Sequence, residues 1–244
     1  MPTIKLTLEY DGTSFVGWQR QLNLPTVQGA VETAIEGITQ EKVSVAGAGR
    51  TDAGVHALGQ VASFRIDRDM TSHEWTRALN AHLPETVTVR AVAVVSDDFH
   101  ARRSAKGKLY EYRILNRPER PALDRHYCWH VYHPLDDGAM NHAALSLTGS
   151  RDFSSFETQP TENEDPVCNL QRLAVIREGD RLRIEAYADR FLKQMVRSIV
   201  GTLVEVGSGK RATSSMPDIL AAKDRTKAGR TAPPQGLYLI RVDY

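Results

Sequence analysis

Residues 46–57 have the sequence AGAGRTDAGVHA, a run of small residues around one acidic side chain, Asp52. Glycine lets the backbone take positive φ and lets a bulky ligand approach the main chain closely. Arg50 stands two residues before Asp52, and a nearby cation favours the ionised form of a carboxylate. The run therefore predicts one of two things. Asp52 is either a nucleophile or base acting on a large flat substrate, or part of a tight turn in which it only accepts a backbone hydrogen bond.

Alternating strands and amphipathic helices are expected on both sides of this run. The expected strands are 4–10, 60–65, 86–95, 108–116, 170–177, 181–187 and 236–244. The expected helices are one that opens at Pro25-Thr26, and 71–83, 137–147 and 191–206. The order strand, helix, strand, strand, helix, strand is repeated loosely in the two halves of the chain, which predicts an α+β fold of two halves with antiparallel sheets. The join near residues 103–105 gives halves 1–103 and 104–244, and the acidic segment 157–166 is expected to be an exposed mobile loop.

Length and composition limit the class of protein. The 244 residues allow one large domain or two of ordinary size. Two distant cysteines exclude a zinc site made of cysteines and argue against a disulfide framework. The N-terminus has no signal-peptide layout and no apolar run reaches membrane-spanning length, which predicts a cytoplasmic protein. The net charge of +1 counts mildly against nucleic-acid binding but leaves room for a local basic face.

Several common catalytic motifs are absent from the sequence. The eight histidines lack metal-ligand spacing such as HExxH, so the sequence predicts no metal site. The glycines around Asp52 form neither a P-loop nor GxGxxG, and no serine lies in GxSxG. Metal, nucleotide and serine-hydrolase chemistry therefore lose support. His56 remains open as an acid–base partner of Asp52 or as a structural residue.

A second candidate region begins the second half. Tyr110 and Tyr112 share one face of the expected strand 108–116. The cations around them are Arg102, Arg103, Lys106 and Lys108. Cations interleaved with aromatics on a sheet suit base stacking and contact with an RNA backbone. The alternative is that both tyrosines pack in the core with their hydroxyls in water.

A third candidate region lies late in the chain. Arg190, Lys193 and Arg197 are three and four residues apart, so on the expected helix 191–206 they form one stripe. An arginine on a partly buried helix needs a carboxylate partner, and Asp52 is a candidate for Arg197. The alternative is a solvated cationic face.

Residues 49–57, GRTDAGVHA, strongly resemble the catalytic segment of the tRNA pseudouridine synthase A family. Further blocks resemble that family in the same order along the chain. They are YDG at 10–12 with FVGWQ at 15–19, TVQG at 26–29, FHAR at 99–102 with YEY at 110–112, FLKQMVR at 191–197 with IVG at 199–201, and APPQGLYL at 232–239. The resemblance runs from end to end of the chain.

The resemblance implies two RRM-like, ferredoxin-like halves around a central cleft, commonly in a homodimer, with neither metal nor organic cofactor. It implies an isomerase that converts uridine to pseudouridine in the anticodon stem–loop of tRNA, at positions 38, 39 and 40. It also implies roles for single residues. Asp52 is the catalytic aspartate, Tyr110 packs on the target uracil, Arg50 helps to hold the flipped nucleotide, Arg197 pairs with Asp52 and Leu237 lines the uracil pocket. Arg102, Arg103, Lys106, Lys108, Arg190 and Lys193 are candidates for contact with the RNA backbone.

The chemistry of this isomerisation accounts for the residue types. The N1–C1′ bond breaks, the uracil turns and C5 joins C1′, so no atom group leaves and no cofactor is needed. The carboxylate can attack C1′, remove a proton from C2′ or attack C6, and each route needs Asp52 ionised. Two other interpretations stay open: a non-catalytic RNA-binding module, and an enzyme that acts on a free nucleoside. The cluster of cations before Tyr110 favours a polyanion over a nucleoside.

Overall fold

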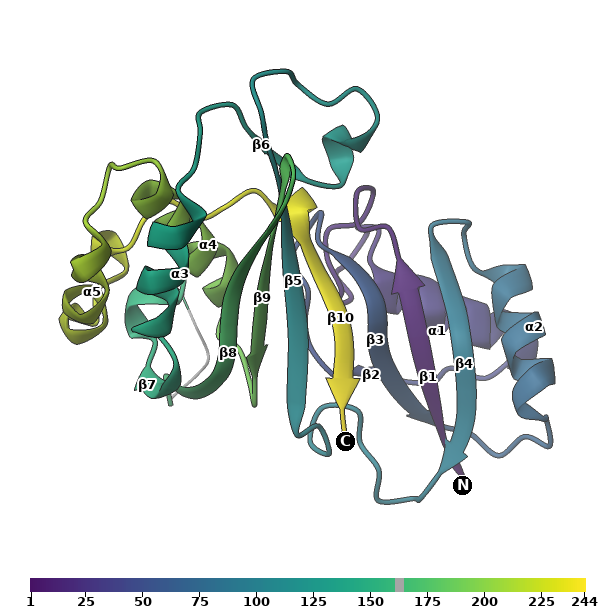
Figure 1. The fold of residues 1–244 in the computed structure, drawn as a ribbon. Coiled ribbons are helices and arrows are strands. Elements are labelled where there is room, and N and C mark those ends of the chain that lie inside the picture. Colours follow the sequence, from purple (N-terminus) through teal and green to yellow (C-terminus); the bar gives the residue numbers. More distant parts are fainter. Residues whose placement is uncertain (161–164) are drawn as a thin grey trace. The chain divides into compact units, whose positions relative to one another are not determined.

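The computed structural model describes residues 1–160 and 165–244, which fall into two compact units. The first unit comprises Met1–Lys106 and Tyr238–Tyr244, and the second comprises Gly107–Leu237. Both combine helices with largely antiparallel strands, which confirms the expected α+β class (Figure 1). The last segment of the chain is grouped with the first unit, whereas the sequence places it in a half 104–244. Residues 161–164 of the expected loop 157–166 lie outside the described residues.

The first unit has the strand–helix repeat expected from the sequence. Its elements are β1 (Thr3–Tyr10), α1 (Val27–Thr39), β2 (Ala46–Gly47), β3 (His56–Arg65), α2 (Ser72–His82) and β4 (Val87–Val95), joined by β10 (Leu237–Asp243). The strands run in the order β4-β1-β3, β2 pairs antiparallel with β3, and β10 pairs parallel with the start of β3. Both helices lie on one face of this sheet (Figure 1). The order β4-β1-β3-β2 is that of a ferredoxin-like half.

Local sequence signals set the boundaries of these elements. The Thr26 side chain accepts a hydrogen bond from the Gly29 backbone N–H and so starts α1. Thr71 and Glu74 form the expected capping box, in which each side chain binds the other residue's backbone N–H. The hydrogen bond from the Thr71 backbone lowers the pKa of the Glu74 carboxyl. Trp75 and Leu79, one turn apart, are buried and attach α2 to the sheet.

The second unit repeats the pattern with additions. Its elements are β5 (Gly107–Asn116), β6 (Trp129–Val131), α3 (Asp137–Leu145), β7 (Gly149–Asp152), β8 (Val167–Glu178), β9 (Arg181–Ala188), α4 (Met195–Gly207) and α5 (Met216–Ala222). The strands run in the order β5-β9-β8-β7, with β6 parallel to β5. The hairpin expected at residues 178–180 is present, with Gly179 at φ +60° between β8 and β9. Helices α3 and α4 lie on one face of β8 and β9 (Figure 1).

Helix α4 begins at Met195, and the prediction that it starts at Phe191 is wrong. Gln194 has φ 59° and ψ 12°, a left-handed conformation that an α-helix cannot contain. The Lys193 carbonyl instead accepts a hydrogen bond from the Thr158 backbone N–H at 3.1 Å. The expected helical stripe of three cations therefore does not form. Arg190, ahead of the helix, donates from Nε to the Val167 carbonyl at 3.0 Å and pairs with Asp165, and the Lys193 ammonium donates to the Pro160 carbonyl at 2.9 Å.

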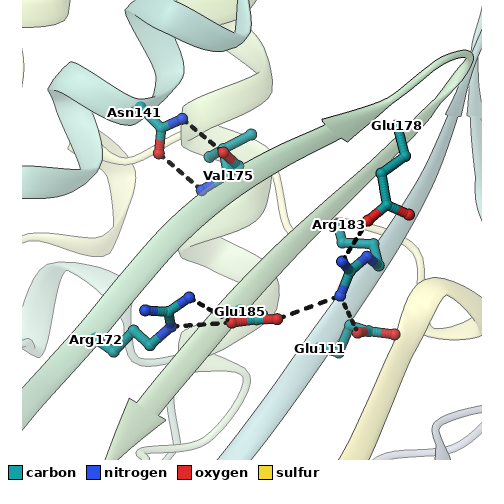
Figure 2. Close-up of polar contacts among 7 residues, drawn as sticks. All are labelled: Glu111, Asn141, Arg172, Val175, Glu178, Arg183 and Glu185. Carbon is teal, nitrogen blue, oxygen red and sulfur yellow. Dashed lines mark hydrogen bonds and ion pairs between the residues drawn. The ribbon is translucent and has the colours of Figure 1, made fainter.

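An asparagine on a helix covers the open edge of a strand in each unit. Asn141 of α3 donates to the Val175 carbonyl of β8 at 2.6 Å and accepts from the Val175 N–H at 2.8 Å (Figure 2). Asn80 of α2 makes the same two bonds to Val89 of β4, at 3.0 and 2.7 Å. Both strands present these groups on a side where no further strand of the described residues pairs with them. The two side chains therefore act as edge covers.

Replacing Asn141 by alanine should lower the free energy of unfolding by about 1–3 kcal/mol, because two backbone groups of Val175 lose their partner. Asn141→Asp should cost a similar amount, since its carboxylate still accepts from the Val175 N–H but faces the Val175 carbonyl. Urea unfolding measures both. A change below about 0.5 kcal/mol in each variant would show that water replaces the side chain at no cost.

Candidate active site

Asp52 lies in an irregular turn between β2 and β3. The Val55 backbone N–H donates to the carbonyl of Asp52 at 3.1 Å and closes the turn. The carboxylate is thus not the group that closes it, and the Asp52 side chain is partly buried while Arg50 is exposed. Arg50 and Asp52 do not belong to a strand, so the shared face that an extended backbone would give them is not the geometry found here.

The segment that follows β1 packs against this turn and forms hydrogen bonds with it. The Trp18 N–H donates to the Thr51 carbonyl at 3.0 Å, and the Gly54 N–H donates to the Phe15 carbonyl at 3.3 Å. Gly17 has φ +95°, and a Cβ there would lie 2.6 Å from the Thr51 carbonyl oxygen. The YDG and FVGWQ blocks therefore form the seat of the Asp52 turn, and Gly17 can approach it only because it lacks a side chain.

Two buried side chains, Tyr10 and Gln60, also hold the turn in place. The Tyr10 hydroxyl lies 2.8 Å from Thr51 Oγ1, and Gln60 Nε2 donates to the Gly49 carbonyl at 2.8 Å. Thr51 and Gly49, the two residues that flank Arg50, are thus anchored to β1 and β3 respectively. Sequence reasoning did not find this network. One available signal was Gln60, a polar residue between apolar neighbours of the strand 56–65.

Burial raises the pKa of the Tyr10 hydroxyl to about 12, against the opposing effect of its hydrogen bonds with Thr51 and Gln60. Below pH 10 both the folded and unfolded chains hold this proton. Between pH 10 and 12 only the folded chain does, so stability should fall as the pH rises through this window. The loss should reach about 2–3 kcal/mol, and Tyr10→Phe should remove it.

Urea unfolding at pH 9 and pH 11.5 measures this difference. Tyr132→Phe is the matched control, because Tyr132 is 60% exposed. This variant should lose as much free energy of unfolding between the two pH values as the wild type does. If the free energy of unfolding fell equally between pH 9 and pH 11.5 in Tyr10→Phe and in the wild type, the loss would not come from Tyr10.

His56 belongs to the framework beneath the turn. Its side chain is buried and stacks on Tyr238 with ring centroids 4.8 Å apart. Its Nδ1 accepts from the Gly12 N–H at 3.1 Å and lies 3.2 Å from Asp11 Oδ1. These contacts support the structural alternative for His56 over a role as acid–base partner.

The basic segment after β4 forms a fixed turn. Buried Ala101 anchors it, because its N–H donates to Ser63 Oγ at 3.0 Å and its carbonyl accepts from the Tyr244 hydroxyl at 2.8 Å. His100 Nδ1 accepts from the Arg102 backbone N–H at 3.1 Å. Burial, with a smaller contribution from the neighbouring arginines, lowers the pKa of His100 and keeps Nδ1 free to accept. The turn thereby holds Arg102, and with it Arg103, in solvent.

The two tyrosines of β5 have different surroundings within the second unit. Tyr112 is fully buried, donates its hydroxyl to the Pro233 carbonyl at 2.7 Å and meets Trp129 edge-on. Its buried ring fits the core alternative, but its hydroxyl binds a backbone carbonyl where that alternative placed it in water. Tyr110 is also buried and contacts Phe191 edge-on, with centroids 5.0 Å apart. Burial of the neighbouring Lys108 counts against contact with an RNA backbone there, whereas Lys106 in the first unit is exposed.

Arg197 lies in the first turn of α4. Its Nε donates to the Ala232 carbonyl at 2.8 Å, and its own carbonyl accepts from the Ala232 N–H at 3.0 Å. A Cβ on Gly201 would lie 1.7 Å from the Arg230 carbonyl oxygen, so glycine permits this close packing. The chain then continues to Leu237, which is buried at the start of β10. Asp52 and Arg197 belong to different units, and their pairing stays a prediction.

Other arginines of the second unit are neutralised by glutamates. Arg183 contacts Glu111 and Glu185, both at 3.3 Å, and Glu178 at 2.6 Å (Figure 2). Arg172 pairs with Glu185 at 2.9 Å. The hydrogen bond with Glu178 raises the pKa of Arg183. Because three glutamates face these two arginines, this sheet surface is a weaker candidate for RNA phosphates than the turn at Arg102.

Two further properties concern the described residues only. No helix among them is both long and apolar enough to cross a membrane. Nor do residues 1–160 and 165–244 contain a cluster of three or more histidine, cysteine, aspartate or glutamate side chains arranged to hold a metal ion.

Comparison with known proteins identifies the family. A family model described as tRNA pseudouridine synthase matches residues 7–102 and 143–244. A tRNA pseudouridine synthase A from Azorhizobium caulinodans is 49% identical over 245 residues, covering 100% of this chain and 95% of the relative. Relatives with the same name from Allorhizobium ampelinum and Acetivibrio thermocellus are 47% and 45% identical, over 100% of this chain and 95% and 100% of their own lengths. The chain therefore belongs to the tRNA pseudouridine synthase family.

Proposed function

We propose that this chain isomerises uridine to pseudouridine in the anticodon stem–loop of tRNA, at positions 38, 39 and 40. The observation that carries the proposal is the Asp52 turn, in which the Asp52 side chain is partly buried and which Tyr10, Gly17 and Gln60 anchor. In the reaction the N1–C1′ bond breaks and a C5–C1′ bond forms. The hydrogen on C5 leaves as a proton and N1 gains one, so atoms balance without a cofactor.

Each candidate residue has a role in this proposal. The Asp52 carboxylate attacks C1′ or C6, or removes the C2′ proton. Arg50 holds the flipped nucleotide, Tyr110 packs on its uracil and Leu237 lines the uracil pocket. Arg197 keeps Asp52 ionised, an assignment that rests on the resemblance. The target base leaves its stack first, at a cost of about a few kcal/mol, and stacking on an aromatic ring offsets part of that cost.

Contact with the rest of the tRNA is assigned to the basic turn. Arg102 and Arg103 are exposed on a turn that three hydrogen bonds fix, and Lys106 follows it. Arginine suits phosphate because its planar fork donates two parallel hydrogen bonds. We also propose a homodimer and a cytoplasmic location, both on the resemblance. Light scattering of the purified protein tests the first.

Release of tritium from tRNA that carries C5-tritiated uridine tests the activity, because C5 loses its hydrogen only when the new bond forms. The expected result is release by the purified protein, with pseudouridine at positions 38–40, and loss of these pseudouridines from cells that lack the gene. Binding of tRNA without release would favour an RNA-binding module. Substrate affinity that does not fall with salt would favour a nucleoside enzyme.

Tyr110→Ala should lower kcat/KM by about 5–150-fold, the effect of about 1–3 kcal/mol of lost stacking on the base. Tyr110→Phe should retain that contribution, and tRNA affinity should stay close to that of the wild type. Tritium release under kcat and kcat/KM conditions measures both variants. Low turnover by Tyr110→Phe with normal affinity would assign a chemical role to the hydroxyl, and unchanged turnover leaves stacking alone. Unaltered kinetics of Tyr110→Ala would remove the residue from the site.

A further inference from the structure

The loop of residues 16–25, between β1 and α1, presents apolar side chains to solvent. Leu22 is 88% exposed, and Val16 and Leu24 are exposed as well. Single exposed leucines are ordinary on protein surfaces. Three apolar side chains on one short loop beside the Asp52 turn are less so.

Hydrogen bonds hold this loop in one shape. The Val16 N–H donates to the Pro25 carbonyl at 2.8 Å and closes the neck, and Gln21 Nε2 donates back to the Val16 carbonyl at 3.2 Å. Asn23 at the tip has φ 59°, the left-handed conformation of a tight turn. Leu22 is thus held outward by a folded tip.

A buried carboxylate fixes the cation next to the tip. Arg20 Nη1 donates to Glu32 Oε2 at 2.8 Å, and the Arg20 N–H donates to Gln28 Oε1 at 2.9 Å. Glu32 is buried, and its other oxygen accepts from the Val45 N–H at 3.0 Å, just before β2. The Arg20 side chain itself remains largely exposed. The loop therefore offers a positioned cation two residues from an exposed apolar side chain.

The base of the loop is the seat of the Asp52 turn. Trp18 donates to the Thr51 carbonyl, and Gly17 lies against the backbone of residues 51–53. The base of the loop is therefore bound to the backbone of the turn that carries Asp52, the residue assigned to the reaction.

We propose that Leu22 is a wedge that enters the RNA base stack beside the target uridine and occupies the space it leaves on flipping, while Arg20 meets the adjacent phosphate. This rests on the proposed function, since it needs an RNA substrate at the Asp52 turn. Apolar side chains that enter base steps stabilise unstacked nucleic acid in this manner. The wedge matters most where the target uridine is paired, because flipping then also breaks a base pair.

The experiment uses two anticodon-arm hairpins, one with the target uridine paired and one with it opposite an abasic site. Leu22→Ser should lower kcat/KM on the paired target about tenfold or more, because no apolar side chain then fills the unstacked base step, and should change it less than about twofold on the unpaired target. Leu22→Met should retain wild-type rates. Leu123→Ser is the matched control, because Leu123 is 86% exposed in the second unit. A 2-aminopurine next to the target should brighten on binding wild-type protein and less with Leu22→Ser.

These outcomes distinguish the failure of the Leu22 wedge from the failure of the proposed function on which it rests. An active wild type with an unaltered Leu22→Ser variant overturns the wedge alone. An equal loss on both hairpins overturns it in favour of a general RNA contact. A change in molecular mass on Leu22→Ser overturns it in favour of an interface between copies. No tritium release by the wild type from either hairpin or from tRNA removes the proposed function itself.

Discussion

Asp52→Asn is expected to reduce tritium release from C5-tritiated tRNA by on the order of 1,000-fold or more, the size of effect seen when an enzyme loses its nucleophile. Asparagine has nearly the same shape as aspartate but carries no charge, so it can neither attack carbon nor take a proton. The Val55 N–H closes the Asp52 turn on the Asp52 carbonyl, and the Trp18 N–H binds the Thr51 carbonyl. The side-chain carboxylate makes neither of these bonds. The variant should therefore fold normally and still bind tRNA.

Asp67→Asn is a suitable control, because Asp67 is exposed beyond the end of β3 and has no assigned role. It should match the wild type in melting temperature, tRNA affinity and rate. If Asp52→Asn kept more than about a tenth of the wild-type rate, the loss of transition-state stabilisation would be below about 1.4 kcal/mol and Asp52 would have no part in the chemistry.

Gly17→Ala is expected to have the second largest effect, on stability and activity together. A left-handed backbone costs alanine about 1–2 kcal/mol, and a Cβ 2.6 Å from the Thr51 carbonyl oxygen adds about 1–3 kcal/mol of overpacking. Part of this strain is relieved if the backbone of residues 51–53 moves away. A shift of about 1 Å at a catalytic group can lower the rate by about 100-fold, so kcat should fall more than KM rises.

Gly149→Ala separates the two causes. Gly149 has φ +94°, almost the same as Gly17 at +95°, but a Cβ there would meet nothing within 4 Å. Gly149→Ala should therefore show the backbone cost of about 1–2 kcal/mol alone, and full activity. Urea unfolding and tritium release measure both variants. Equal destabilisation by the two, with full activity in each, would show that Gly17 does not seat the Asp52 turn.

The predictions from sequence succeeded where the signal is local. Alternation marked β1, the spacing of Thr71 and Glu74 marked the start of α2, and residues 178–180 marked the hairpin. The start of α4 could not be predicted in this way, because Phe191 and Leu192 continue the apolar period of the helix. The chain turns instead at Gln194, where Thr158 binds the preceding carbonyl from a remote part of the sequence.

The same distinction between local signals and remote contacts applies to the candidate site. The turn around Asp52 follows from its small residues and can be predicted without a structure, but Gly47 makes room for the Trp18 ring and not for a ligand. The anchoring of that turn cannot, since Tyr10 and Thr51 are 41 residues apart and nothing in either neighbourhood specifies the partner. Likewise the sequence could not choose between stacking and core roles for the two tyrosines of β5. The hydroxyl of Tyr112 meets the Pro233 carbonyl across 121 residues of chain.

The asparagines at Val89 and Val175 bear on how copies of this chain can meet. An open strand edge invites β-augmentation, in which a neighbouring molecule adds a strand through main-chain hydrogen bonds. Here the N–H and C=O that such a strand would need at those positions are already bound to Asn80 and Asn141. A strand added at these positions would first have to displace an asparagine side chain, and losing either asparagine would leave a template for aggregation when the protein is warmed.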